Sequence, residues 1–198
     1  MSHPLIIDGG ILAGGLASRM QGEDKGLQLF ENMPMASWVC QALSPYVRNV
    51  IINCNRNQSE YSKISNHISS DTIKGFPGPL AGIVSVMEAS DADYFLISPC
   101  DTPLLKQSFS LEMLQFLHSQ YALTPNKPLL FAAKVGDKQQ PLHMCIAKEY
   151  KSSLKQYLEK DEHRVMKWMS DNNAHWLDFD TQDESFKNFN TLEEINTY

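Results

Sequence analysis

The fold is decided by the stretch Leu12-Ala13-Gly14-Gly15-Leu16-Ala17-Ser18-Arg19-Met20, which continues to Gly22, Asp24 and Lys25. It follows the apolar residues Leu5-Ile6-Ile7 and Ile11-Leu12, which predict a first strand. Two adjacent glycines at the end of a strand let the backbone turn sharply and approach a ligand closely. Their N–H groups can point at phosphate oxygens, and a helix that follows adds its positive end. Because Arg19 and Lys25 add positive charge, the stretch predicts a loop that binds a nucleoside triphosphate.

This loop differs from the two common glycine-rich fingerprints. A P-loop requires Gly-x-x-x-x-Gly-Lys followed by Ser or Thr, whereas Lys25 follows Asp24 and precedes Gly26. The Gly-x-Gly-x-x-Gly pattern of dinucleotide-binding proteins is absent. A glycine-rich turn with a solvated basic tail is the alternative interpretation. The concentration of glycine, arginine and lysine near one strand end favours the phosphate-binding loop.

Length, composition and charge limit the classes of function. The 198 residues fit one domain or at most two small ones, and a hydrophobic share of 42% is typical of a chain with a buried core. The net charge of -6 gives no general attraction for nucleic acid or acidic membranes. An anionic ligand must therefore be bound by a local cluster of positive groups.

The four cysteines, Cys40, Cys54, Cys100 and Cys145, are widely spaced and form no Cys-x-x-Cys pair. This spacing argues against a zinc site and is typical of reduced thiols. No signal-peptide pattern is seen at the start of the sequence, and no apolar segment approaches the roughly 20 residues that span a bilayer. We therefore expect a cytoplasmic protein without nucleic-acid or membrane partners.

Strand and helix signals alternate along the chain. Strands are expected at residues 5–12, 50–53, 94–98, 129–135, 142–147 and 175–179, with a weaker piece near Ile68. Helices are expected at residues 35–43, 58–64, 80–89, 111–119, 149–158 and 165–171, with a last one near Ile195. This alternation predicts a mainly parallel sheet with helices on both faces. Val135-Gly136-Asp137-Lys138 resembles a turn, which predicts one antiparallel strand.

Polar groups follow several of these strands. Asn53 ends the second strand, Asp71 follows the weak third one, and Asp101 follows residues 94–98 through Pro99 and Cys100. Ligands of open α/β sheets bind beyond the carboxyl ends of the strands, so these groups are expected near the glycine loop. A carboxylate in the position of Asp101 suits Mg²⁺, which prefers one or two carboxylates with phosphate oxygens and water.

Each of these residues also has an ordinary structural interpretation. Asp101 can form the turn that leads to Pro103, Asn53 can be a turn former, and Asp71 can cap a helix or lie on the surface.

The pattern Leu-Ala-Gly-Gly-x-x-x-Arg-Met-x-Gly-x-Asp-Lys at residues 12–25 resembles the signature loop of the molybdopterin-dependent nucleotidyltransferases. It is most similar to the molybdenum cofactor guanylyltransferases of the MobA type. The resemblance extends from Gly9 to near Ile195. It includes Gly78-Pro79-Leu80-Ala81-Gly82, the Pro-Cys-Asp-x-Pro motif from Pro99 to Pro103, Arg164-Val165, and Asn188-Phe189-Asn190-Thr191.

The resemblance implies a Rossmann-like, three-layer α/β nucleotidyltransferase fold with a mostly parallel sheet. It implies a single domain over residues 1–198, with a nucleotide-binding half at about 1–105 and an acceptor-binding half at about 106–198. The implied reaction transfers GMP from GTP to the phosphate of molybdenum-molybdopterin, releases pyrophosphate and forms a guanine dinucleotide cofactor. Mg²⁺ is the implied cofactor, other molybdenum-cofactor assembly proteins are implied partners, and we expect a monomer.

The resemblance also assigns expected roles to residues of this chain. The expected catalytic residues are Asp101, which is also the metal ligand, Lys25 and Arg19. Nucleotide binding is expected from Leu12, Ala13, Gly14, Gly15, Lys25, Asn53, Asp71 and Asp101. Acceptor binding is expected from Arg164, Asn188 and Asn190. Arg164 as a surface residue at a helix start, and Asn190-Thr191 as a helix cap, are the structural alternatives.

Some positions depart from the family pattern. Gly10 stands inside the first strand where an apolar, branched residue is expected, because glycine weakens a strand. Gln21 replaces a commoner glycine, and Leu192 stands where the family often has proline.

The sequence also allows three other functions. They are cytidylyl transfer to the same pterin, nucleotidyl transfer to a sugar phosphate, and nucleotide binding by a regulator without turnover. Asp101, Arg19 and Lys25 together argue against the regulator, since a binding module needs no metal carboxylate.

Overall fold

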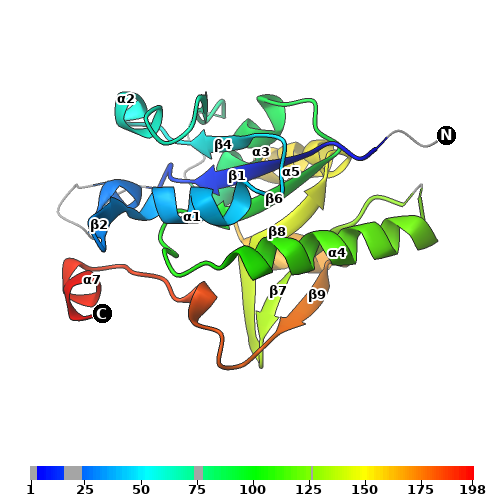
Figure 1. Ribbon diagram of the computed structural model, residues 1–198. Coiled ribbons are helices and arrows are strands. Elements are labelled where there is room, and N and C mark those ends of the chain that lie inside the picture. Colours follow the sequence, from blue (N-terminus) through cyan, green and yellow to red (C-terminus); the bar gives the residue numbers. More distant parts are fainter. Residues whose placement is uncertain (1–3, 16–23, 74–77, 126) are drawn as a thin grey trace.

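The computed structural model describes residues 4–15, 24–73, 78–125 and 127–198 (Figure 1). The strands of these residues are β1 (Ile7–Leu12), β2 (Leu29–Phe30), β3 (Met33–Pro34), β4 (Val50–Asn53), β5 (His67–Ser69), β6 (Tyr94–Pro99), β7 (Leu130–Val135), β8 (Lys138–Ala147) and β9 (His175–Phe179). The helices are α1 (Met35–Leu43), α2 (Gln58–Tyr61), α3 (Pro79–Glu88), α4 (Gln107–Leu123), α5 (Tyr150–Glu159), α6 (Val165–Asp171) and α7 (Leu192–Thr197), with short 3-10 helices η1 (Lys25–Leu27) and η2 (Glu184–Phe186).

The main sheet of the described residues has seven strands in the order β5-β4-β1-β6-β8-β7-β9. All neighbouring pairs are parallel except those of β8, which runs antiparallel to both β6 and β7. The turn from Val135 to Lys138 joins β7 to β8, so the predicted antiparallel strand is confirmed. Because β9 pairs with β7, the sheet contains strands from the whole length of the chain.

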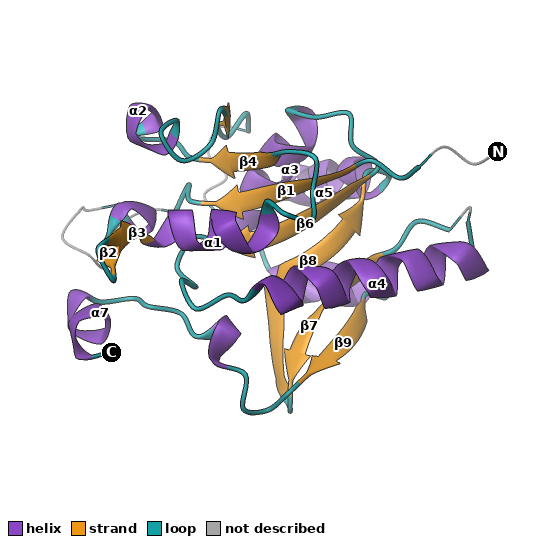
Figure 2. Ribbon diagram, in the orientation of Figure 1, coloured by secondary structure: helices purple, strands orange, loops and turns teal. Residues whose placement is uncertain are grey.

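Helices cover the two faces of this sheet, as the alternating pattern predicted. Figure 2 shows α1 and α4 in front of the strands and α3 and α5 behind them. One core cluster contains Val39 of α1 and Phe109 of α4, and the other contains Val86 of α3 and Trp168 of α6. The result is the three-layer α/β architecture, in which the carboxyl ends of β1, β4 and β6 open on the same edge.

Gly10 is explained by the packing of α3 against β1. A Cβ atom on Gly10 would lie 2.5 Å from Cδ1 of Ile97 and 2.9 Å from Cγ1 of Val86. Glycine in a strand interior often marks such a close approach. The expectation of a branched residue at this position was therefore wrong, because the space above the strand is already filled.

The amino end of β1 is held by the buried carboxylate of Asp8. Arg48 donates from Nε to Asp8 Oδ1 at 3.0 Å and from Nη2 to Asp8 Oδ2 at 2.8 Å. Burial alone would raise the pKa of Asp8, but the hydrogen bonds from Arg48 and Ser90 outweigh it and lower the pKa. This ion pair lies at the end of β1 opposite the glycine loop.

Several elements differ from the sequence prediction, among them α2, which ends at Tyr61 rather than at residue 64. Helix α4 is longer at both ends than residues 111–119, and β8 begins at Lys138 rather than at residue 142. The hairpin β2–β3 was not predicted, because two-residue strands carry no hydrophobic period. Its turn residues Glu31 and Asn32 have φ values of 47° and 65°, as a two-residue hairpin turn requires.

Candidate active site

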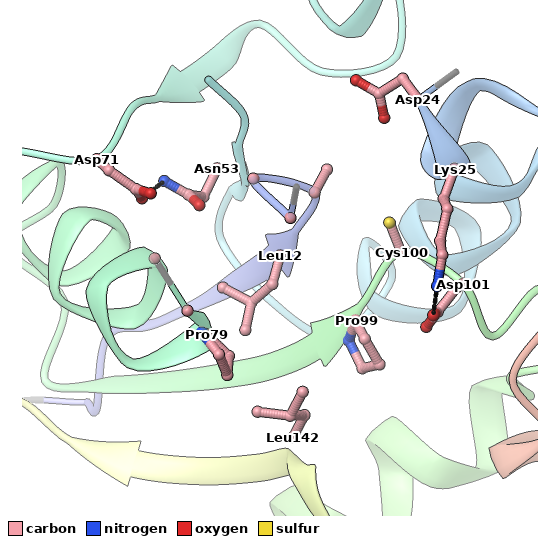
Figure 3. A pocket seen from close by; sticks show the side chains of 15 residues that line it. Leu12, Asp24, Lys25, Asn53, Asp71, Pro79, Pro99, Cys100, Asp101 and Leu142 are labelled. Carbon is pink, nitrogen blue, oxygen red and sulfur yellow. Dashed lines mark hydrogen bonds and ion pairs between the residues drawn. The ribbon is translucent and has the colours of Figure 1, made fainter. Parts of the chain in front are cut away.

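A cavity of about 390 Å³ lies at the carboxyl ends of β1, β4 and β6. All eight residues expected to bind the nucleotide line it, together with residues to which no role was assigned. The described lining residues are Leu12, Ala13, Gly14, Gly15, Asp24, Lys25, Asn53, Asp71, Gly78, Pro79, Gly82, Pro99, Cys100, Asp101 and Leu142. Figure 3 shows a charged pair at one end of the cavity and an amide–carboxylate pair at the other, with Leu12 between them.

The charged end contains Lys25 and Asp101. The Nζ atom of Lys25, at the start of η1, lies 3.4 Å from Oδ2 of Asp101, which follows β6. The other carboxylate oxygen, Asp101 Oδ1, is buried and has no hydrogen-bond partner among the described residues. Burial raises the pKa of Asp101, and the ammonium group of Lys25 opposes this shift.

This arrangement fits Mg²⁺ as an expected cofactor. A buried carboxylate oxygen without a partner is costly unless a cation or a donor meets it. No group of three or more His, Cys, Asp or Glu side chains that could hold a metal occurs within the described ranges. Asp101 therefore suits a cation that takes its remaining ligands from phosphate oxygens and water, as Mg²⁺ commonly does.

The other end of the cavity is built around Asp71. Asn53 donates from Nδ2 to Asp71 Oδ1 at 3.1 Å, and Asn55 donates from Nδ2 to Asp71 Oδ2 at 2.7 Å. Asn55 also accepts a bond from the backbone N–H of Asp71 at 2.9 Å and lies 3.3 Å from the carbonyl oxygen of Gly14. Asn55, to which sequence reasoning assigned no role, thus connects Asp71 to the glycine loop.

Two glycines allow Asn53 to occupy this position. A Cβ on Gly14 would lie 2.8 Å from Oδ1 of Asn53, and a Cβ on Gly82 would lie 2.6 Å from the same atom. The Asn53 side chain, with only 1% of its residue surface exposed, therefore lies between the glycine loop and α3. Within the Gly-Pro-Leu-Ala-Gly segment, Gly82 is the residue that serves this packing.

Asp24 fixes the chain next to Lys25. Its carboxylate is buried, and it accepts hydrogen bonds from the hydroxyl of Tyr61 and, at 3.4 Å, from Nδ2 of Asn57. Burial, with further contributions from Cys100 and Asp24, raises the pKa of Tyr61, so that hydroxyl stays protonated and donates. Asp24 was part of the quoted motif, but no signal in the sequence paired it with Tyr61.

The turn after Asp101 is held by a buried histidine. The hydroxyl of Thr102 lies 3.3 Å from the carbonyl oxygen of Pro99 and 3.3 Å from Nε2 of His143. Burial lowers the pKa of His143 to about 3, so its ring is neutral at pH 7. His143 also packs edge-on against Phe109 and Phe186, which makes it a packing residue.

The C-terminal motif residues occupy different places. Asn190 Oδ1 accepts a hydrogen bond of 2.7 Å from Lys25 Nζ, which brings Asn190 to the charged end. Asn188 is exposed, and Arg164 at the start of α6 has 74% of its side-chain surface exposed and lies 3.7 Å from Glu162. None of the three, Asn190 included, is among the described cavity-lining residues. Arg19 and Gln21 lie outside the described residues.

Thr191 is the N-cap of α7. Its hydroxyl accepts from the backbone N–H of Glu194 at 3.1 Å, and the Glu194 side chain accepts from the backbone N–H of Thr191 at 3.2 Å. The capping interpretation of this segment is therefore confirmed, and it coexists with the contact between Asn190 and Lys25. Among the helices that the structure describes, none has the length and apolar character to cross a membrane.

Comparison with known proteins identifies the family. Residues 9–175 match the MobA-like NTP transferase domain. Over 188 residues the chain is 37% identical to a molybdenum cofactor guanylyltransferase of Shewanella halifaxensis, with 95% of this chain and 91% of that one covered. It is 34% identical over 191 residues to one from Haemophilus influenzae, with 96% of each chain covered.

Solved structures show the same fold at lower identity. Molybdopterin-guanine dinucleotide biosynthesis protein A from Archaeoglobus fulgidus superimposes with a TM-score of 0.72 at 17% identity, covering 96% of this chain and 95% of that one. The 4-diphosphocytidyl-2C-methyl-D-erythritol synthase of Anaerococcus prevotii gives 0.71 at 13% identity, covering 98% and 94%. These likenesses concern the fold, whereas the domain match and the relatives above 30% identity decide the family. The chain belongs to the MobA-like NTP transferase family and is a nucleotidyltransferase.

Proposed function

We propose that this enzyme transfers GMP from GTP to the terminal phosphate of molybdenum-bearing molybdopterin, releases pyrophosphate and forms the guanine dinucleotide cofactor. The observation that carries the proposal is the division of one cavity into a charged end at Lys25 and Asp101 and a hydrogen-bonding end at Asn53 and Asp71. A nucleoside triphosphate has the same division between its phosphates and its base. The names of the curated relatives support guanine as the base and the molybdenum cofactor as the product.

The hydrogen-bonding end suits the nucleoside. A carboxylate accepts up to about four hydrogen bonds, and Asp71 receives one at each oxygen from Asn53 and Asn55. Asp71 therefore keeps capacity to accept from guanine N–H groups or from ribose hydroxyls. Pro79 and Gly82 of α3 and Leu142 of β8 provide apolar surface in the same cavity.

The charged end suits the triphosphate. Lys25 Nζ offers N–H donors to phosphate oxygens, and the backbone of Gly14 and Gly15 also lines the cavity. Asp101 would hold Mg²⁺ through its unpartnered oxygen. When bound, Mg²⁺ supplies positive charge that polarises the phosphoryl group and stabilises the leaving pyrophosphate. Arg19 is part of this proposal as a further source of positive charge.

The chemistry requires no covalent enzyme intermediate. An oxygen of the acceptor phosphate attacks the α-phosphorus of GTP in line, and the bond from that phosphorus to the bridging oxygen of pyrophosphate breaks. A phosphate monoester is already a nucleophile, so no general base is needed. Two unit negative charges 4 Å apart repel by about 4 kcal/mol at an effective dielectric constant near 20. The main tasks of the site residues are therefore charge neutralisation and orientation.

The acceptor side is a separate part of the proposal. Arg164 and Asn188 are proposed to bind the pterin phosphate, Arg164 through its planar guanidinium fork. Both are exposed, so an incoming acceptor or a cofactor-assembly protein can reach them.

The test is a pyrophosphate-release assay with purified protein, Mg²⁺, molybdenum-molybdopterin and either GTP or CTP. We expect product with GTP, and loss of most turnover in Lys25→Ala and Asp101→Ala with the fold intact. Lys134→Ala and Asp178→Ala are matched controls, because they break another Lys–Asp pair with a 3.4 Å separation between β7 and β9. These controls are expected to retain turnover.

Each alternative function has its own outcome in this assay. Preference for CTP would replace the guanylyl assignment by cytidylyl transfer, and product with a sugar phosphate in place of the pterin would move the enzyme to that class. Tight GTP binding without Mg²⁺-dependent pyrophosphate release would favour a non-catalytic regulator. Near-normal turnover of Lys25→Ala or Asp101→Ala would contradict the roles of these residues.

A further inference from the structure

The segment before α7 contacts both charged residues of the cavity, Asp101 through its backbone and Lys25 through its side chain. The backbone N–H of Phe189 donates to the carbonyl oxygen of Asp101 at 2.9 Å. The Oδ1 atom of Asn190 accepts from Lys25 Nζ at 2.7 Å, whereas Asp101 Oδ2 lies 3.4 Å from the same nitrogen. Asn190 is thus the nearer partner of the ammonium group, although it is 165 residues away in sequence.

The position of Asn190 is set by its surroundings. Its backbone N–H donates to Oε2 of Glu194 at 2.6 Å, so it shares the carboxylate that caps α7. The neighbouring Phe189 is fully buried, and its ring centroid lies 5.1 Å from that of Phe30 and 5.5 Å from that of Tyr198. The amide of Asn190 is therefore presented to Lys25 by a fixed backbone.

Asparagine has the right chemistry for this contact. A lysine ammonium group has three N–H donors, so bonding to Asn190 and proximity to Asp101 leave donor capacity for a phosphate oxygen. The amide is neutral, so it orients the ammonium group without cancelling its charge. A free lysine side chain has high rotamer entropy, and this entropy is lost when the side chain is fixed by a bound ligand. If Asn190 already holds the side chain, part of the entropy loss no longer opposes ligand binding.

We propose that Asn190 is a positioning residue that holds Lys25 ready for the triphosphate. This inference rests on the proposed role of Lys25 in phosphate binding. It assigns Asn190 a role on the nucleotide side, where the family resemblance implied the acceptor side. A residue that only contacts the acceptor does not change the affinity for GTP when no acceptor is present, so the two roles can be separated.

The first experiment measures GTP binding by calorimetry with Mg²⁺ and without acceptor. Asn190→Ala is expected to weaken binding by about twofold to tenfold, the loss that corresponds to immobilising one long side chain when the ligand binds. Asn190→Asp is expected to weaken it at least as much, since a second carboxylate would neutralise Lys25. Asn188→Ala, the matched asparagine of the same segment, is expected to leave GTP affinity unchanged. In a Lys25→Ala background, Asn190→Ala is expected to have no further effect.

The second experiment needs no nucleotide. The rate of acylation of Lys25 by acetic anhydride is measured by mass spectrometry relative to the exposed Lys138. Asn190→Ala is expected to raise this ratio, because the ammonium group is released from its closest contact, while Asn188→Ala is expected to leave it unchanged. This measurement tests the contact even if wild-type protein does not bind GTP, an outcome that would contradict the proposed function instead.

Three results would overturn the inference. One is an Asn190→Ala variant with wild-type GTP affinity and wild-type Lys25 acylation. Another is full additivity of the Lys25 and Asn190 substitutions. The third is an equal loss of GTP affinity in Thr191→Ala, which removes the cap of α7 but keeps the Asn190 amide, because this would attribute the effect to the helix end.

Discussion

Gly82 in α3 gives a test of how the end of the cavity that is proposed to bind the nucleoside is built. In Gly82→Ala, the added Cβ would lie 2.6 Å from Oδ1 of Asn53, which is 0.8 Å short of ordinary van der Waals contact at 3.4 Å. The second neighbour, Cδ2 of Leu12 at 3.2 Å, is the end of a flexible side chain and can move. The clash therefore falls on the Asn53 amide.

The size of the effect follows from what holds Asn53. Its side chain is buried and its Nδ2 lies 3.1 Å from Oδ1 of Asp71, so a displacement approaching 0.8 Å breaks this hydrogen bond. A hydrogen bond to a charged group contributes about 1.5–3 kcal/mol. If the displaced pair binds the nucleoside, the affinity for GTP falls by about tenfold to a hundredfold. Replacing glycine by alanine inside a helix would by itself stabilise the protein by roughly 0.5–1 kcal/mol, so helix propensity opposes the clash.

The assay is titration calorimetry of GTP with Mg²⁺ for Gly82→Ala, Asn53→Ala and the double variant. Because the alanine acts through Asn53, the double variant is expected to bind GTP as weakly as Asn53→Ala alone. Gly9→Ala is the control, since its Cβ would meet only apolar side chains at 3.3 Å or more and Gly9 is not a described cavity residue. Wild-type affinity in Gly82→Ala, or additive losses in the double variant, would refute the reasoning.

Three further substitutions test other parts of the structure. Asn55→Asp is expected to weaken GTP binding more than Asn55→Ala, because a carboxylate oxygen would replace Asn55 Nδ2, which lies 2.7 Å from Oδ2 of Asp71. Titration calorimetry measures the GTP affinity of both variants. Burial raises the folded-state pKa of Asp101 above 3.8, so ionisation of this carboxyl group opposes folding. Asp101→Asn is therefore expected to gain stability relative to wild type as the pH rises above 3.8, which urea unfolding at pH 4 and pH 7.5 would show. The same variant is expected to lose pyrophosphate release. The pKa of Asp8 shifts in the opposite direction, so its ionisation favours folding. The folded-state pKa of Asp8 is lowered, so Asp8→Asn is expected to cost about 1–3 kcal/mol at pH 7 and less as the pH falls below 3.8, measured by the same unfolding curves.

Much of the cavity at the carboxyl ends of β1, β4 and β6 could be predicted, because it depends on local signals and one topological rule. The glycine loop, Asn53 and Asp101 lie at or just beyond the carboxyl ends of strands with strong apolar runs, and parallel strands bring these ends to one edge. Asp71 follows the short β5, whose signal was weak, yet it arrives at the same edge because β5 pairs in parallel with β4. The order of these strands was not needed for this part of the prediction.

The remaining parts depend on contacts between segments that no local pattern connects. The pairing of Asp24 with Tyr61, and the space above Gly10 that is filled by Val86 and Ile97, depend on how helices pack on the sheet. The resemblance selected Asn190 as functional but implied the acceptor side rather than Lys25. The proposed roles of Arg164 and Asn188 remain predictions.

The hydrogen bond from Phe189 to Asp101 also has a consequence for protein synthesis. Residues 189 and 190 are translated long after the glycine loop, Lys25 and Asp101, yet they contact two of these groups. All strands of the main sheet except β9, which pairs with β7, have been synthesised once the ribosome reaches residue 147. We therefore expect the nascent chain to form the strand part of the cavity before residues 189 and 190 are present. Full affinity for the triphosphate is expected only after residue 190 has emerged from the exit tunnel.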